Sequence, residues 1–302
     1  MAGELLKFEQ THIYTTKAPV AQVLQDLKSI HEAGLSISQR ITLYKRAFIV
    51  SVICAMLSVF IGGVVAQNFS PELGVAVIVV CVLACIVLGV FFFSSRKGAF
   101  DGRCDVLLAR ALDFLSRDMP PEAPVQVTLD LRSHTHPQKL VRTGKVHQWK
   151  VKFYVDKWLL LSGRLLDGTS FRLAATTRLQ ARSKTKRSSS GKTKWKHKTK
   201  ESTVLGLRLR FKPERYSHVA AIADAQRAVQ LPMGVTVRAV STAPNSALLA
   251  ATLPKWENVP AGKEPGGSVS GPHTVAMMFL SLYQVLNLSK ELDRAGKRGG
   301  GK

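Results

Sequence analysis

The chain has 302 residues, enough for one or two domains, and its hydrophobic content of 46% excludes a generally disordered protein. It carries 43 Lys and Arg against 20 Asp and Glu, and the formal net charge of +23 favours phosphate-rich partners, either anionic lipid or nucleic acid. The four cysteines form neither a secreted disulfide pattern nor a CxxC zinc pair, which excludes a small disulfide scaffold.

The first 46 residues show a helical pattern. Within 18–30 the apolar residues recur at the spacing of one helix face, at Val20, Val23, Leu24, Leu27 and Ile30. The first long apolar run begins only after this segment, so it does not have the position of a cleaved signal peptide. We therefore predict that residues 1–46 form a cytoplasmic, amphipathic helical segment.

Two uncharged apolar runs follow, at 47–66 and 73–93. A helix needs about 20 apolar residues to cross a bilayer, so each run is long enough to span one. The link 67–72 is too short for more than a tight turn, and residues 47–93 are therefore predicted to form a transmembrane helical hairpin. Neither run contains an ionisable residue, which argues against an ion path or a proton relay.

Small residues line one face of each apolar run. They are Ser51, Ala55, Ser58, Gly62 and Ala66 in the first run and Gly74, Cys81, Cys85 and Gly89 in the second. Small side chains let two helices approach closely in lipid, either within one hairpin or between two copies of the chain. We favour packing within the hairpin, because it requires no partner.

The charges that flank the two runs predict their orientation. Arg40, Lys45 and Arg46 precede the first run, Arg96, Lys97 and Arg103 follow the second, and the link between the runs has no Lys or Arg. By the positive-inside rule both termini face the cytoplasm. We expect an integral membrane protein with two spans, located in the plasma or inner membrane.

Residues 97–292 are predicted to form a basic cytoplasmic α+β domain, followed by a flexible tail at 293–302. Alternating or apolar stretches indicate strands at 125–131, 150–155, 157–166, 169–182, 203–211, 235–241 and 247–253. Helical patterns occupy 104–119, 213–229 and 273–292, and the last is interrupted by polar residues, so we predict a core-packed helix rather than a third span. The expected fold is a two-helix transmembrane hairpin followed by a mostly antiparallel sheet with packed helices.

The segment 182–200 holds nine Lys or Arg and no acidic residue, and it joins two of the predicted strands. It is either the tip of a long hairpin or a disordered loop, and its composition favours the loop. The candidate residues for binding anionic ligands or lipid in this segment are Lys184, Lys186, Arg187, Lys192, Lys194, Trp195, Lys196, Lys198 and Lys200. On the neighbouring strands the candidates are Arg172, Arg178, Arg208 and Arg210, which either bind an anion or are covered by acidic side chains.

No recognisable motif indicates catalysis, a cofactor or a metal. SSSGKT at 188–193 lacks the first glycine, the buried strand and the helix of a phosphate loop. His134 and His136 have no third metal ligand nearby in the sequence. We therefore expect a non-catalytic adaptor or complex subunit that binds anionic lipid head groups or another anionic ligand, with protein partners in the membrane. The alternatives are a membrane-tethered nucleic-acid-binding protein and an enzyme acting on a membrane-borne anionic substrate.

Overall fold

A computed structural model of the chain describes residues 8, 11–68, 71–95, 102–187, 192–222, 225–254, 256–257 and 269–299. Arg96, Lys97 and residues 188–191 of the basic segment lie outside this part of the chain. The α+β fold class is confirmed. The chain forms two compact units, one made of residues 1–28 with 101–302 and the other of residues 29–100.

Two long helices, α2 (Val20–Asn68) and α3 (Pro71–Ser95), contain both apolar runs. The two helices are long and apolar enough to cross a membrane. Most of their large apolar side chains are exposed, as for Phe60 at 75%, and this pattern suits a lipid environment better than water.

The two helices pack against each other within one chain, as the small residues predicted. The aromatic ring of Phe48 on α2 lies over Gly89 on α3, where an added β-carbon would be 3.1 Å from Phe48 Cε2. Ser58 is buried in the same hairpin, and the rings of Tyr44 and Phe91 stack at 6.0 Å. Small residues at these positions therefore give the larger side chains room.

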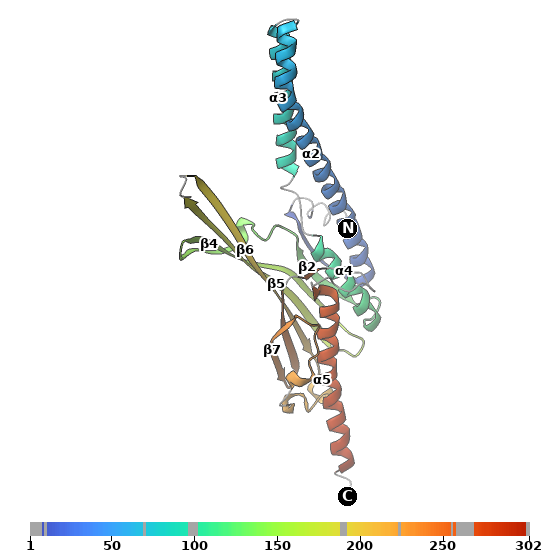
Figure 1. Ribbon diagram of the computed structural model, residues 1–302. Helices are drawn as coiled ribbons and strands as arrows, with labels where there is room; N and C mark the ends of the chain where they lie inside the picture. The colour runs from blue at the N-terminus through green and yellow to red at the C-terminus, as the bar shows by residue number, and fades with distance from the viewer. Residues whose placement is uncertain are drawn as a thin grey trace. The chain divides into compact units, whose positions relative to one another are not determined.

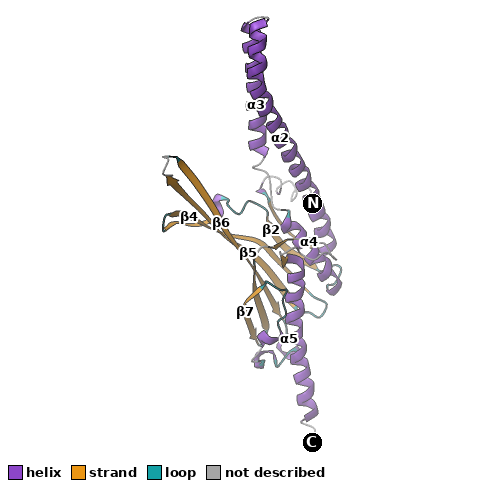
Figure 2. Ribbon diagram, in the orientation of Figure 1, coloured by secondary structure: helices purple, strands orange, loops and turns teal. Residues whose placement is uncertain are grey.

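The unit made of residues 1–28 and 101–302 contains an antiparallel sheet with the strand order β1-β2-β4-β5-β6-β8-β7, in which β3 also pairs with β4 (Figures 1 and 2). The strands are β1 (Ile13–Pro19), β2 (Pro124–Asp130), β3 (Leu140–Val146), β4 (Trp149–Arg164), β5 (Ser170–Arg187), β6 (Thr193–Arg210), β7 (Thr236–Ala243) and β8 (Ser246–Leu253). A separate parallel pair joins β9 (Trp256–Glu257) to β10 (Val269–Ser270).

Helices α4 (Arg103–Leu115) and α5 (Gly271–Gly299) pack on one face of the sheet. Alternate residues in 171–179 of β5 and in 203–209 of β6 face these helices and are buried, and the ring of Phe171 on β5 meets Phe279 on α5 edge-to-face at 5.6 Å. Val275, Phe279 and Leu282 of α5 are buried, which confirms the core-packed helix. We call this side of the sheet the helix side.

Several sequence predictions about single elements were wrong. The tail predicted from residue 293 is helical up to Gly299, because α5 continues. In the described part of 213–229, which leaves out 223–224, three short 3-10 turns replace the predicted helix: η4 (Pro213–Arg215), η5 (Val219–Ala221) and η6 (Ala225–Ala228). Tertiary contacts override helix propensity there, because Arg215 and Tyr216 both donate hydrogen bonds to Asp167 in the β4–β5 turn.

Two strands of the eight-stranded sheet were not predicted, β1 and β3. β1 pairs with β2 along its whole length, so residues 13–19 belong to the sheet and the helix begins at Val20. Tyr14, Thr16 and Ala18 face the core, and the polar Thr16 weakens the apolar alternation. All seven residues of β3 are exposed, so this strand has no buried alternation to detect.

The predicted strands 150–155 and 157–166 are one strand, β4, with a bulge. Asp156 pairs with Thr177, and Leu159 pairs with Ala175, so three steps on β4 match two on β5. A bulge of this kind exchanges the faces to which alternate side chains point. Before the bulge the even-numbered residues of β4 face the helix side, and after it the odd-numbered residues do.

The β5–β6 pair continues without a break from Ser170↔Arg210 to Arg187↔Thr193. The long-hairpin alternative for the basic segment is therefore correct over 182–187 and 193–200, and the disordered-loop alternative is wrong there. The turn at Asp167-Gly168 was predicted, and Gly168 has a φ of +82°, which a residue without a β-carbon adopts freely. Figure 2 shows the two strands extending beyond the others.

Candidate anion-binding site

The regular alternation of β5 and β6 places their basic residues on the sheet face opposite the helix side. We call this surface the basic face. It consists of five residues of β5 and six of β6: Arg172, Arg178, Arg182, Lys184, Lys186, Lys194, Lys196, Lys198, Lys200, Arg208 and Arg210. All of these side chains are exposed or half-buried. The basic face therefore presents eleven cations on two neighbouring strands.

Four direct cross-strand pairs on the basic face join like charges. They are Arg172↔Arg208, Arg182↔Lys198, Lys184↔Lys196 and Lys186↔Lys194. Directly opposite side chains lie about 5 Å apart at their β-carbons, and like charges at that separation destabilise the strand pair. An anion placed between them would remove this repulsion.

No carboxylate of the described residues forms an ion pair with any member of the basic face. Glu201 is the one acidic residue between 168 and 211, and its position on β6 directs it to the helix side. Arg182 donates from Nη2 to Gln180, while its buried Nε has no hydrogen-bond partner among the described residues. The arginine faces are thus open to solvent rather than covered by acidic side chains.

Basic side chains lie over two aromatic rings on the basic face. Lys184 Nζ lies 4.8 Å and Lys198 Nζ 5.9 Å from the ring centroid of Trp149. Arg142 of β3 lies 4.8 Å from the ring centroid of Phe153. Such contacts hold lysine and arginine side chains close to the sheet.

The structure brings most of the candidates together, but not all of them. Arg187 and Trp195 lie on the helix side of the hairpin, opposite the lysines that neighbour them in the sequence. Trp195 is 70% exposed there. Lys192 precedes β6 and is exposed, and Thr193 begins a strand rather than the helix that a phosphate loop needs.

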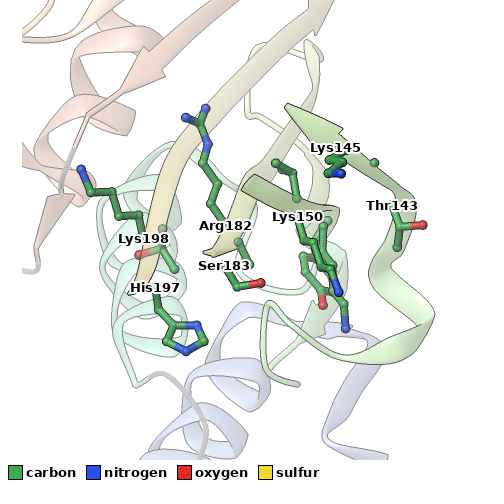
Figure 3. Close-up of a pocket in the computed structure, with 13 residues that line it drawn as sticks. Thr143, Lys145, Lys150, Arg182, Ser183, His197 and Lys198 are labelled. Atoms are coloured by element: carbon green, nitrogen blue, oxygen red, sulfur yellow. The ribbon is translucent and has the colours of Figure 1, made fainter. Parts of the chain in front are cut away.

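A basic groove of about 750 Å³ lies on the β5–β6 hairpin. It is on the helix side of the sheet, where α4 and α5 do not cover the strands. The residues that line it include Lys145, Lys150, Lys152, Ser183 and His197, from four neighbouring strands. Strand register aligns Lys145, Lys150, Ser183 and His197 in one row across β3, β4, β5 and β6. Figure 3 shows Ser183 and His197 leaving the strands on the side opposite Arg182 and Lys198.

This groove could not be predicted from the sequence, because two features that form it leave no clear sequence pattern. Strand β3 was not predicted, so Lys145 had no assigned neighbours. The bulge at 156–159 was also not predicted, and without it Lys150 and Lys152 appear to lie on the face opposite the core.

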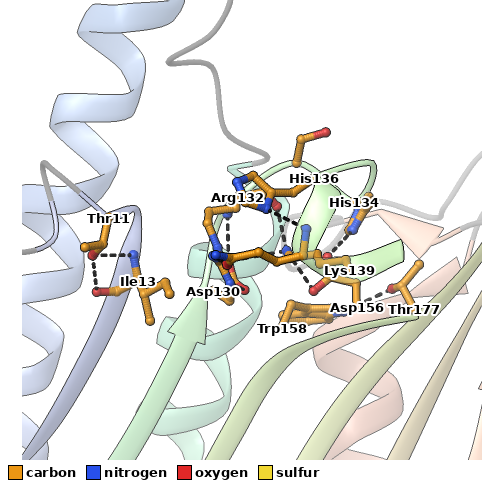
Figure 4. A network of polar contacts seen from close by, with 12 residues as sticks. Thr11, Ile13, Asp130, Arg132, His134, His136, Lys139, Asp156, Trp158 and Thr177 are labelled. Atoms are coloured by element: carbon orange, nitrogen blue, oxygen red, sulfur yellow. Dashed lines mark hydrogen bonds and ion pairs between the residues drawn. The ribbon is translucent and has the colours of Figure 1, made fainter. Parts of the chain in front are cut away.

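A buried polar cluster joins the β2–β3 loop to strand β4 (Figure 4). Lys139 Nζ lies 2.8 Å from Asp156 Oδ1 and 3.3 Å from Asp130 Oδ1. Asp156 Oδ2 lies 2.6 Å from His134 Nδ1, and His136 accepts a hydrogen bond from the backbone of Gln138. Both histidines thus have structural contacts in the loop, and no group of three metal-binding side chains occurs in the described ranges.

Asp130 is held in its charged form within this cluster. Burial alone raises the pKa of Asp130, but hydrogen bonds from Arg132 and the charges of Lys139 and Arg132 outweigh burial and set the pKa below its ordinary value. Hydrogen bonding to Asp130 likewise raises the pKa of Arg132. The cluster therefore contributes to loop stability while Asp130 is ionised.

Comparison with protein-family models, with curated proteins and with solved structures found no match, so the residues and their geometry are the basis for assigning a function.

Proposed function

We propose that this protein is a membrane-anchored, non-catalytic binding protein whose basic face contacts anionic lipid head groups. The observation that supports this proposal most strongly is the set of four like-charge pairs across β5 and β6. These pairs have no carboxylate partners among the described residues. These pairs raise the free energy of the unbound hairpin, and a layer of phosphate groups would lower it. Each basic residue close to an anionic leaflet contributes on the order of 1 kcal/mol, so several weak contacts suffice.

In this proposal α2 and α3 cross the membrane as a hairpin, and both termini lie in the cytoplasm. Arg40, Lys45 and Arg46 precede the apolar part of α2, and positively charged flanks remain on the cytoplasmic side of a bilayer. The cytoplasmic leaflet of the plasma or inner membrane carries the anionic lipid that the basic face requires. Attachment to the same membrane keeps the lipid concentration around the domain high, so weak docking is sufficient.

The test uses the full chain in phosphatidylcholine nanodiscs, mixed with vesicles that contain or lack phosphatidylserine. We expect binding to the anionic vesicles only, with an affinity that falls as salt rises. A variant with K184Q, K186Q, K194Q and K196Q should lose at least about tenfold in affinity, since four contacts are removed. The matched control R110Q, R117Q, K157Q and K212Q removes the same charge from exposed positions elsewhere in the domain and should retain most of the binding.

Equal binding to neutral vesicles, or equal losses in the two variants, would exclude the basic face as a lipid-docking surface. A nucleic acid is the alternative partner, and the covered rings of Trp149 and Phe153 disfavour it, because bases stack on free aromatic faces. Tighter binding to duplex DNA than to anionic vesicles, with a steep salt dependence, would favour that alternative.

A further inference from the structure

We propose that the basic groove on the helix side of the hairpin is a second, separate site that binds clustered phosphate groups. Its positive charge comes chiefly from residues outside the basic face, namely Lys145, Lys150 and Lys152. The proposal does not depend on lipid docking by the basic face.

The register of four strands gives the groove a defined set of donors. Lys145 and Lys150 are direct cross-strand partners, so their like charges repel unless an anion lies between them. Lys152 follows Lys150 on the same side of β4, about 7 Å along the strand from the usual rise per residue. Three lysine side chains thus leave the sheet within one small area.

Hydroxyl and imidazole groups complete the lining. Ser183 and His197 continue the row that begins at Lys145 and Lys150, and Thr143 and Thr199 continue the row of Lys152. Hydroxyl groups donate hydrogen bonds to phosphate oxygens, and lysine serves as a point charge for them. These donors suit several phosphate oxygens close together better than one planar carboxylate, which arginine binds in bidentate fashion.

The size and charge of the groove indicate a small, highly charged ligand. Its volume of about 750 Å³ lies within the usual range of small-molecule sites, about 300–1,000 Å³. No carboxylate is among the residues that line the groove, and the buried Tyr154 is one of them. The ligand class is therefore a compound with neighbouring phosphate groups, either free in solution or as a phosphorylated lipid head group.

The experiment uses inorganic tripolyphosphate as the probe and the full chain in phosphatidylcholine nanodiscs, with binding followed by calorimetry. The groove variant K145Q, K150Q and K152Q should bind tripolyphosphate at least about tenfold more weakly than the unchanged chain, because clustered charge contacts are lost. The matched variant R110Q, R117Q and K157Q removes the same charge from exposed positions outside the groove and the basic face, and it should change the affinity by less than about threefold, the effect of long-range charge alone.

A second arm identifies the source of the phosphates. Vesicles containing phosphatidylinositol bisphosphate are compared with phosphatidylserine vesicles of equal total charge. A preference for the bisphosphate that the groove variant loses assigns the site to a lipid head group, and equal binding of both vesicle types assigns it to a soluble phosphate compound. The site is refuted if both variants weaken tripolyphosphate binding equally, or if neither does.

The two proposals fail separately. In one outcome the variant K184Q, K186Q, K194Q and K196Q loses vesicle binding, while the groove variant binds tripolyphosphate as well as the unchanged chain. This result would refute the groove and support lipid docking. The reverse pattern would support the groove and refute docking by the basic face. Thermal unfolding of each variant in the same nanodiscs verifies that the substitutions leave the fold intact.

Discussion

Arg172 on β5 lies directly opposite Arg208 on β6, and both guanidinium groups are exposed without a carboxylate partner among the described residues. A pair of like charges in this position opposes strand pairing, whereas opposite charges support it by about 0.2–1 kcal/mol. The retention of such a pair near the open end of a long hairpin is understandable if an anion normally lies against it.

The substitution Arg172→Glu should therefore stabilise the unbound protein and weaken its binding to anionic vesicles. We expect a gain of about 0.5 kcal/mol in the free energy of unfolding, since a repulsive pair becomes an attractive one. Thermal unfolding in neutral nanodiscs measures the first effect and vesicle sedimentation the second. Arg172→Gln is the control for loss of charge alone, and a destabilised R172E protein would contradict the prediction.

The exposed Trp195 distinguishes two ways in which the hairpin could meet a membrane. Because Trp195 lies opposite the lysines, contact through the basic face leaves its indole away from the lipid. Trp195→Ala should then change the affinity for anionic vesicles by less than about twofold, as expected of a surface substitution outside the contact. A tip-first insertion predicts a larger loss and a blue shift of Trp195 fluorescence on binding.

The buried lysine of the polar cluster should be important for stability. Lys139→Met leaves Asp156, whose side chain is 1% exposed, without its ammonium partner, and breaking a buried ion pair costs about 3–5 kcal/mol. Adding Asp156→Asn to this variant should recover part of the loss, because no unpaired charge then remains at that position. Unfolding midpoints of the two variants measure this, and strictly additive losses would show that the two groups do not interact.

The lowered pKa of Asp130 predicts a pH dependence at the acidic end. A carboxyl group with a lowered pKa stabilises the folded state above its ordinary pKa of about 4, and this contribution is lost as the pH falls through the lowered value. Asp130→Asn should therefore be less stable than the unchanged chain at pH 7, with the difference shrinking below about pH 4. Unfolding curves at several pH values test this, and a constant difference would contradict it.

The sequence predicted the fold where a single local pattern determines it. The unbroken alternation of 169–182 and 203–211 predicted both strands and their arginine faces, and apolar length predicted α2 and α3. The hairpin form of the basic segment was harder, because its composition resembles that of a mobile loop. In the structure its backbone is fixed by pairing with the neighbouring strand, which composition does not reveal.

The groove depends on features that alternation cannot show. Apolar residues occupy odd positions on both sides of the bulge, yet Val155 and Leu159 point to opposite faces, because one additional residue separates them. The pattern looks continuous in the sequence although the faces exchange. Strand β3 is equally hard to detect, since it is exposed along its whole length and its position depends on pairing with β4.

The position of β1 has a consequence for the order of biosynthesis. β1 pairs with β2 from Ile13↔Asp130 to Pro19↔Pro124, and α2 and α3 lie between these strands in the chain. A ribosome adds about 5–20 residues per second, so β1 waits several seconds for the strand beside it. Both apolar helices have left the ribosome before the sheet can close, and a nascent chain arrested ahead of residue 124 would expose the apolar face of β1 to proteases and chaperones.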